Sequence, residues 1–210
     1  MIPAPRRALA AVCLGMGGAA VVAALVTGTS CGPPDVPVTE RGTDPLLAAP
    51  TGQSAGSPEV APSDVTTLVI DRLGVRAPVD PVTVRDGELA VPDDPTRVGW
   101  WVDGARPGAA IGTVVLDGHV DYDGTTGALA VVPQLLVGDV VELRGTDGAS
   151  SWSVQAVQSY PKATGLPDQL FTAGGPPRLA LITCGGAFDE GADSYQDNVV
   201  AYAVPTPAAG

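Results

Sequence analysis

The sequence predicts an all-β domain, and three observations carry that prediction. Its 210 residues include 27 glycines and 21 prolines but only 4% aromatic residues, a composition that disfavours a helical bundle. Short runs of apolar and β-branched residues recur from Val65 onward. Asp-Gly turn signals recur between them, at Asp86-Gly87, Asp103-Gly104, Asp123-Gly124 and Asp147-Gly148. Many short strands joined by turns are typical of a barrel or a sandwich.

The expected strands follow one another closely along the chain. They are Val65–Ile70, Val75–Val79, Val82–Val84, Val98–Trp101, Gly112–Leu116, Val140–Arg144, Trp152–Tyr160, Leu179–Thr183 and Val199–Val204. Only two segments have the pattern of short helices, Gly127–Leu136 and Pro167–Phe171. Pro133 interrupts the first of these, which favours a single turn over a long helix.

Residues 1–31 have the pattern of a membrane-directed segment. Arg6 and Arg7 precede an uncharged apolar run from Ala8 to Val26, which at about 1.5 Å per residue reaches roughly the 30 Å of a bilayer core. The two arginines favour the cytoplasmic side, so the rest of the chain is expected outside the cell membrane. Three interpretations stay open: a retained single-pass anchor, a cleaved signal peptide, or a lipoprotein signal with Cys31 lipidated.

Residues 32–63 are rich in proline and glycine and show no hydrophobic period, which predicts an extended, semi-stiff extracellular linker. The folded domain is therefore expected over residues 64–206.

The charge and the residue counts exclude several functions. The formal net charge is −12 and Lys162 is the only lysine, so no basic stripe is available and nucleic-acid binding is not expected. One histidine and three cysteines are too few for an ordinary zinc site. The segment Asp121–Gly124 begins like a calcium loop but lacks its later ligands. We expect no metal and no cofactor.

Cys184 ends an apolar, β-branched segment, Leu181–Thr183, and two glycines follow it. A cysteine at a strand end beside glycine backbone is well placed to meet a substrate. A buried structural cysteine would give the same local pattern, so both interpretations stay open at this point.

His119 also follows an apolar strand, Val114–Leu116, and leads into a loop rich in turn signals. A histidine chosen for packing would be equally compatible with this position. A cysteine nucleophile, however, needs a partner that holds a proton and passes it to the leaving amine. The domain offers one candidate for each role.

Seven segments carry a family pattern, and they stand in this order: Val98–Trp101, Arg106–Gly108, Gly118–Asp121, Gly138–Val141, Tyr160–Lys162, Leu181–Gly186 and Asp197–Val200. Through these segments the chain resembles the sortases, and it is most similar to the class E/F sortases of actinobacteria. The similarity runs from about Val65 to Val204.

The resemblance implies a closed β-barrel of about eight strands with one or two short helices, and a cysteine transpeptidase site. It implies that Cys184 attacks the threonine carbonyl of a Leu-Pro-x-Thr-Gly-type sorting signal to form a thioacyl enzyme. It assigns His119 as the acid that protonates the leaving glycine amine, and Thr183 as the family's residue before the cysteine. The implied partners are sorting-signal peptides of surface proteins and an amine acceptor such as a cell-wall precursor.

Two positions depart from the family pattern. Gln196 stands where an arginine is expected to orient the substrate and the oxyanion, and Asn198, two residues on, would share its strand face. Asp117 stands where a small apolar residue is usual, two residues before His119. We hypothesise that Asp117 favours the charged form of the imidazole; an ordinary solvated turn residue is the alternative.

Two alternatives to the transpeptidase function therefore stay open. One is a non-catalytic or impaired sortase-fold protein that binds sorting-signal peptides, because Gln196 replaces the arginine. The other is an unrelated secreted β-domain in which Cys184 belongs to the core.

Overall fold

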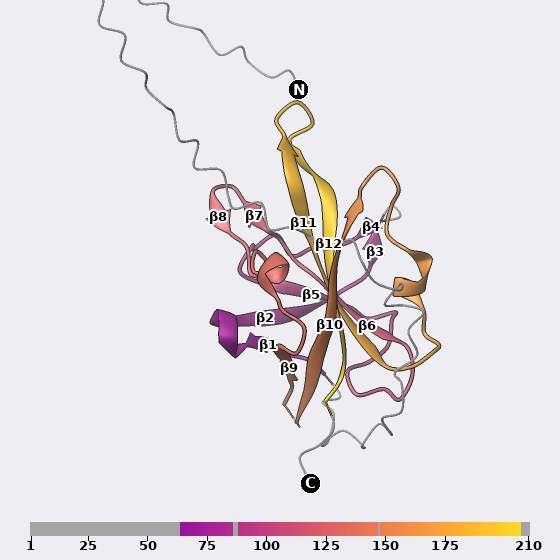
Figure 1. Ribbon diagram of the computed structural model, residues 1–210. Coiled ribbons are helices and arrows are strands. Elements are labelled where there is room, and N and C mark those ends of the chain that lie inside the picture. Colours follow the sequence, from indigo (N-terminus) through magenta and orange to yellow (C-terminus); the bar gives the residue numbers. More distant parts are fainter. Residues whose placement is uncertain (1–63, 86–87, 147, 207–210) are drawn as a thin grey trace, which may run out of the picture. The chain divides into compact units, whose positions relative to one another are not determined.

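The computed structural model describes residues 64–85, 88–146 and 148–206. The expected anchor (1–31) and the expected linker (32–63) precede these residues, so both predictions lie outside the described part. The described chain forms a closed barrel of eight strands in the order β1-β2-β5-β6-β11-β12-β10-β9 (Figure 1). The predicted all-β barrel is confirmed.

The barrel strands are β1 (Thr67–Ile70), β2 (Val75–Val82), β5 (Val98–Trp101), β6 (Thr113–Asp117), β9 (Val140–Arg144), β10 (Ala149–Pro161), β11 (Arg178–Asp189) and β12 (Ser194–Pro205). Two small hairpins accompany them, β3 (Val84–Arg85) with β4 (Glu88–Leu89), and β7 (Asp121–Tyr122) with β8 (Thr125–Thr126). Short 3-10 helices lie at η1 (Asp71–Leu73), η2 (Val132–Gln134) and η3 (Asp168–Phe171).

Side chains of the interior come from alternate positions of the barrel strands. In β11, Leu179 and Leu181 point inward, and in β6 their neighbours Val114 and Leu116 do the same. All four side chains are almost fully excluded from solvent. This burial of apolar surface, at about 25 cal/mol per Å², fixes the strand register, because a slip by one residue would turn the apolar side chains outward.

A second apolar cluster covers the outside of the barrel. It includes Val115 of β6, Ile182 of β11 and Val200 of β12, and Leu170 of η3 packs against it. Phe171, also of η3, meets the ring of Trp101 edge-on with 5.6 Å between ring centroids. The β10–β11 connection is thereby held against the outer face of these strands.

Three details differ from the sequence expectations or refine them. Strand β2 continues through Pro78 and Pro81 as far as Val82, where the sequence suggested two shorter strands. Both prolines are exposed, so their rings do not interrupt the barrel interior. The 127–136 segment contains only η2, with Pro133 in its first turn, which agrees with the expected single turn.

The β7–β8 hairpin was expected only as a turn. Asp123 and Gly124 have φ of +47° and +74°, the left-handed conformation that a two-residue hairpin turn requires. Among the described residues no helix is long and apolar enough to cross a membrane.

Candidate active site

The ends of two parallel strands bring the segments of Cys184 and His119 together. Strands β6 and β11 pair in parallel, with Leu116 opposite Leu181 and Asp117 opposite Ile182. The N–H of Gly118 continues this pairing by donating to the Ile182 carbonyl at 3.2 Å. His119 follows Gly118 directly and Cys184 lies two residues after Ile182, so both residues lie just beyond the last paired residues of β6 and β11, at the same end of this strand pair.

Thr183 joins the two segments with its side chain. Its hydroxyl is buried and donates to the carbonyl oxygen of Gly118 at 2.8 Å, which links the residue before Cys184 to the residue before His119. A buried hydroxyl needs such a partner, and this bond accounts for a hydroxyl side chain at the position. Thr183 is therefore placed to fix the spacing between the thiol and the imidazole.

Cys184 faces away from the barrel interior. Because side chains alternate along β11, Thr183 points inward and Cys184 points outward with Ile182. Its sulfur is a free thiol on a half-buried residue. Gly185 follows closely, and a Cβ at that position would lie 2.5 Å from a methyl of Val199, so the strand past the cysteine requires glycine.

His119 is held by contacts on two sides. Its Nε2 lies 3.0 Å from the carbonyl oxygen of Pro92. Its ring packs against the ring of Tyr122 of β7, with 5.0 Å between centroids. Behind it, a Cβ on Gly127 would lie 2.0 Å from the His119 carbonyl oxygen, so the backbone approaches too closely for any other residue.

Tyr195 is a site residue that the sequence reasoning did not identify. Its hydroxyl donates to the Asp121 carboxylate at 3.0 Å, which ties the start of β12 to β7. Burial raises the pKa of Tyr195, and the hydrogen bond to Asp121 and the charges of Asp121 and Cys184 raise it further. No pattern around Tyr195 signals this role, because it depends on the docking of two distant hairpins.

Of the two candidate oxyanion donors, Asn198 lies directly opposite Cys184. The β11–β12 register pairs Cys184 with Asn198, and both share the outward face. Gln196 is exposed and lies where the register shifts between Gly185 and Phe188. Its carbonyl accepts the N–H of Lys162 at 2.8 Å. The register therefore brings Asn198 beside the sulfur more directly than Gln196.

Asp117 is a half-buried residue at the end of β6. Burial raises the pKa of its carboxyl to about 7, although the Gly118 N–H and the charge of Lys162 act in the opposite direction. The neighbouring His119 directs Nε2 to the Pro92 carbonyl. Support of the His119 charge by Asp117 stays a prediction.

This raised pKa predicts a pH-dependent stability. A carboxyl that binds its proton more tightly in the fold contributes stability below its ordinary pKa, near 3.8, and loses it as the pH rises through about 7. The melting temperature of the native chain should fall between pH 5 and pH 8, and we expect this fall to be about 5 °C smaller in Asp117→Asn. Differential scanning calorimetry measures the melting temperatures, with the exposed Asp103→Asn as the matched control. Parallel curves for Asp117→Asn and the native chain would contradict this account.

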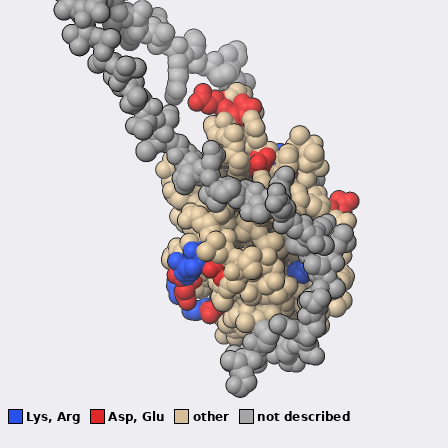
Figure 2. All heavy atoms as spheres, in the orientation of Figure 1, with Lys and Arg blue, Asp and Glu red and all other residues tan. Residues whose placement is uncertain are grey.

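Acidic side chains gather at the end of the β11–β12 hairpin (Figure 2). They include the exposed carboxylates of Asp189, Glu190 and Asp193. Within the described ranges, no three histidine, cysteine or acidic side chains are grouped in a way that could hold a metal ion.

The described chain is a closed β-barrel in which the free thiol of Cys184 and the imidazole of His119 lie on segments joined by the β6–β11 pairing. The model of the Sortase domain family matches residues 68–206, and the chain belongs to this family, whose members are cysteine transpeptidases. The interpretation as an unrelated β-domain is thereby excluded. No curated protein matches the chain.

Solved structures of sortases share the fold. Sortase C1 of Streptococcus agalactiae, in complex with MTSET, aligns with a TM-score of 0.55 at 15% identity, over 70% of this chain and 72% of that one. Sortase C1 of Streptococcus suis aligns with a TM-score of 0.54 at 15% identity, over 70% and 74%. Sortase C-1 of Streptococcus pneumoniae aligns with a TM-score of 0.53 at 17% identity, over 69% and 67%.

Proposed function

We propose that this protein is a cell-surface cysteine transpeptidase that cleaves a Leu-Pro-x-Thr-Gly-type sorting signal and transfers it to an amine acceptor. The observation that carries the proposal is the pairing of β6 with β11, which puts the segments of His119 and Cys184 side by side. The N-terminal segment would keep the domain at the outer face of the cell membrane. The residues that resemble class E/F sortases support assignment to that class.

The chemistry assigns one task to each group. The Cys184 thiolate adds to the threonine carbonyl, and the threonine–glycine C–N bond then breaks as the leaving amine takes a proton from the His119 imidazolium. The amine acceptor later attacks the thioester and releases the thiol. The amide N–H groups of Asn198 or Gln196 would donate to the oxyanion, and the Thr183 bond keeps the two reacting groups in register.

The direct test is transfer of a quenched sorting-signal peptide to an amine by the full chain. We expect fluorescence release and a product whose mass equals the peptide up to threonine joined to the amine. Binding of the peptide without cleavage or transfer would instead support the impaired peptide-binding protein.

That alternative function rests on Gln196, because a neutral amide replaces the arginine expected from the family pattern. Loss of one preorganised oxyanion donor costs about 100- to 1,000-fold in rate. We therefore expect Gln196→Arg to raise kcat/KM by about 100-fold. Gln196→Lys adds a positive charge without the planar guanidinium and its paired N–H donors, so it should raise kcat/KM much less. Steady-state kinetics with the quenched peptide measures both variants.

An unaltered rate in Gln196→Arg would show that the arginine position was assigned wrongly. In that case Asn198→Arg, directly opposite Cys184, is the substitution expected to raise the rate.

A further inference from the structure

The contact between His119 and Pro92 determines which imidazole nitrogen carries a fixed proton. The Pro92 carbonyl oxygen can only accept a hydrogen bond, so the nitrogen 3.0 Å away, Nε2, must be protonated to make one. Nε2–H can donate to this oxygen in both the neutral and the charged ring. The nitrogen left free to gain and lose a proton is then Nδ1.

The segment that carries Pro92 is tied down beyond that residue. The guanidinium of Arg97 forms a two-bonded ion pair with the Asp80 carboxylate of β2. The Asp94 carboxylate accepts hydrogen bonds from the N–H and the hydroxyl of Thr96, at 2.9 and 2.7 Å. These bonds make the Pro92 carbonyl a preorganised acceptor on a fixed support.

The same segment also contacts the backbone behind His119. The Pro95 carbonyl accepts the N–H of Ala128 at 2.8 Å, and the neighbouring residue Gly127 donates its N–H to Val120 at 2.9 Å. The 92–97 segment therefore meets the imidazole at Pro92 and the His119 loop at Pro95. Movement of the segment would alter both the ring orientation and the loop.

We propose that the Pro92 carbonyl, supported by the Asp80–Arg97 ion pair, is the positioning group of the general acid, and that Nδ1 of His119 delivers the proton. The inference rests on the proposed transpeptidase. When the C–N bond of the tetrahedral intermediate breaks, its electron pair stays on the amine nitrogen, which takes the proton from Nδ1–H. Nε2–H keeps its bond to Pro92 throughout, so the ring leaves the step neutral and in the same orientation.

A single-atom change in the backbone tests this role. Replacing Asp93 by its α-hydroxy acid turns the Pro92–Asp93 amide into an ester, whose carbonyl oxygen is a weaker acceptor. The same change at Asp94 weakens the Asp93 carbonyl and is the matched control, because neither the Asp93 carbonyl nor the Asp94 N–H bonds to another described residue.

The readout is the NMR signal of the ring N–H of His119, the only histidine in the chain. In the full chain labelled with ¹⁵N-histidine, we expect one downfield Nε2–H signal that is protected from exchange. The ester at position 93 should move this signal upfield, speed its exchange, and lower kcat about fivefold with little change in KM. The ester at position 94 should leave all three unchanged.

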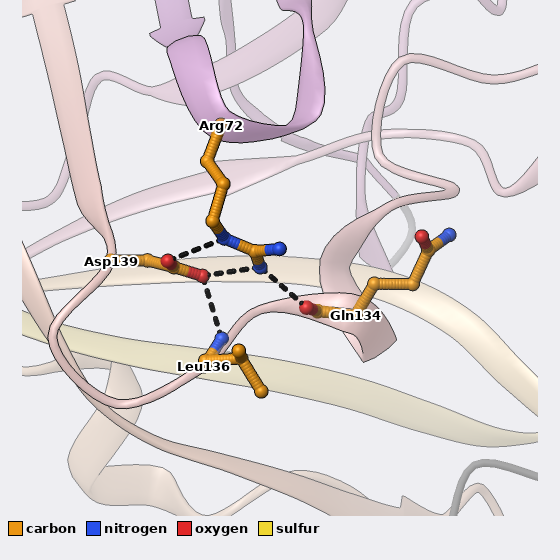
Figure 3. A network of polar contacts seen from close by, with 4 residues as sticks. All are labelled: Arg72, Gln134, Leu136 and Asp139. Atoms are coloured by element: carbon orange, nitrogen blue, oxygen red, sulfur yellow. Dashed lines mark hydrogen bonds and ion pairs between the residues drawn. The ribbon is translucent and has the colours of Figure 1, made fainter.

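Arg97 provides a second test that needs no ester. We expect Arg97→Ala to lose the protected Nε2–H signal and lower kcat, and Arg97→Lys to restore part of both. Arg72 forms a similar two-bonded ion pair with Asp139, and its remaining bond goes to the Gln134 carbonyl (Figure 3). Arg72→Ala therefore removes an equivalent ion pair without touching the 92–97 segment, and the His119 signal should persist.

The NMR signal does not require activity, so the positioning role and the transpeptidase function can fail separately. A protected Nε2–H in an inactive chain would overturn the function and keep the ring contact. A proton on Nδ1 alone in the neutral ring, or an ester at position 93 that behaves as the native chain, would overturn the positioning role.

Discussion

Replacing Cys184 by alanine is expected to abolish transfer of the sorting-signal peptide, with a loss of about 10⁴-fold or more. The thiolate is the group that forms the covalent intermediate, and no other cysteine lies within the described residues. Water held near His119 would be a far weaker nucleophile. Product formation, followed by mass spectrometry over several hours, measures the loss.

Cys13→Ala is the matched control, because it removes a cysteine that precedes the barrel in the sequence and has no assigned role. We expect its activity and melting temperature to equal those of the native chain. Cys184→Ala should also keep the native melting temperature within a few degrees, since the half-buried side chain points away from the interior. Peptide cleavage that persists in Cys184→Ala would contradict nucleophilic catalysis by this residue.

His119→Ala is expected to lower kcat/KM for the peptide by about 10²- to 10⁴-fold, the range for loss of a general acid. The reason is the leaving group, since an amine cannot depart from the tetrahedral intermediate without a proton. A substrate with a phenolate leaving group needs no such proton. The comparison of a sorting-signal peptide with the corresponding phenyl ester therefore isolates the acid role of His119.

We expect His119→Ala to act on the ester with a much smaller loss than on the peptide. Equal losses on both substrates would show that the variant disturbs the position or ionisation of Cys184 and that proton delivery to the amine is not its task. Tyr122→Leu, which removes the ring that packs on His119 and keeps the imidazole, is the companion variant.

The strands could be predicted from sequence because their signals are local. β-Branched runs and Asp-Gly turns marked most strands of the barrel, and Leu181–Thr183 fell within β11. Their order in the barrel comes from pairings over long sequence separations, such as β6 with β11, which no local pattern reports. The family resemblance implied a closed barrel of about eight strands but not their order, which comes from the structure, as does the reason for a buried hydroxyl at Thr183.

The parts that escaped prediction depend on backbone or on register. Pro92 acts through a carbonyl group, which every residue has, so its side chain carries no signal. Gly127 was expected at the start of a helical turn, and its true constraint is the approach of the His119 carbonyl. Gln196 and Asn198 share a strand face in the sequence pattern, but only the β11–β12 register distinguishes the residue opposite Cys184.

In the proposed reaction, the thiol of Cys184 on β11 and the imidazole of His119, just after β6, make and resolve a thioester. The most direct measurement is the intact mass of the full chain after seconds of mixing with a sorting-signal peptide. We expect an added mass equal to the peptide acyl fragment ending in threonine, located on Cys184 by digestion and removed when an amine is added. A chain that cleaves the peptide without ever carrying this adduct, or carries it at another residue, would contradict the account.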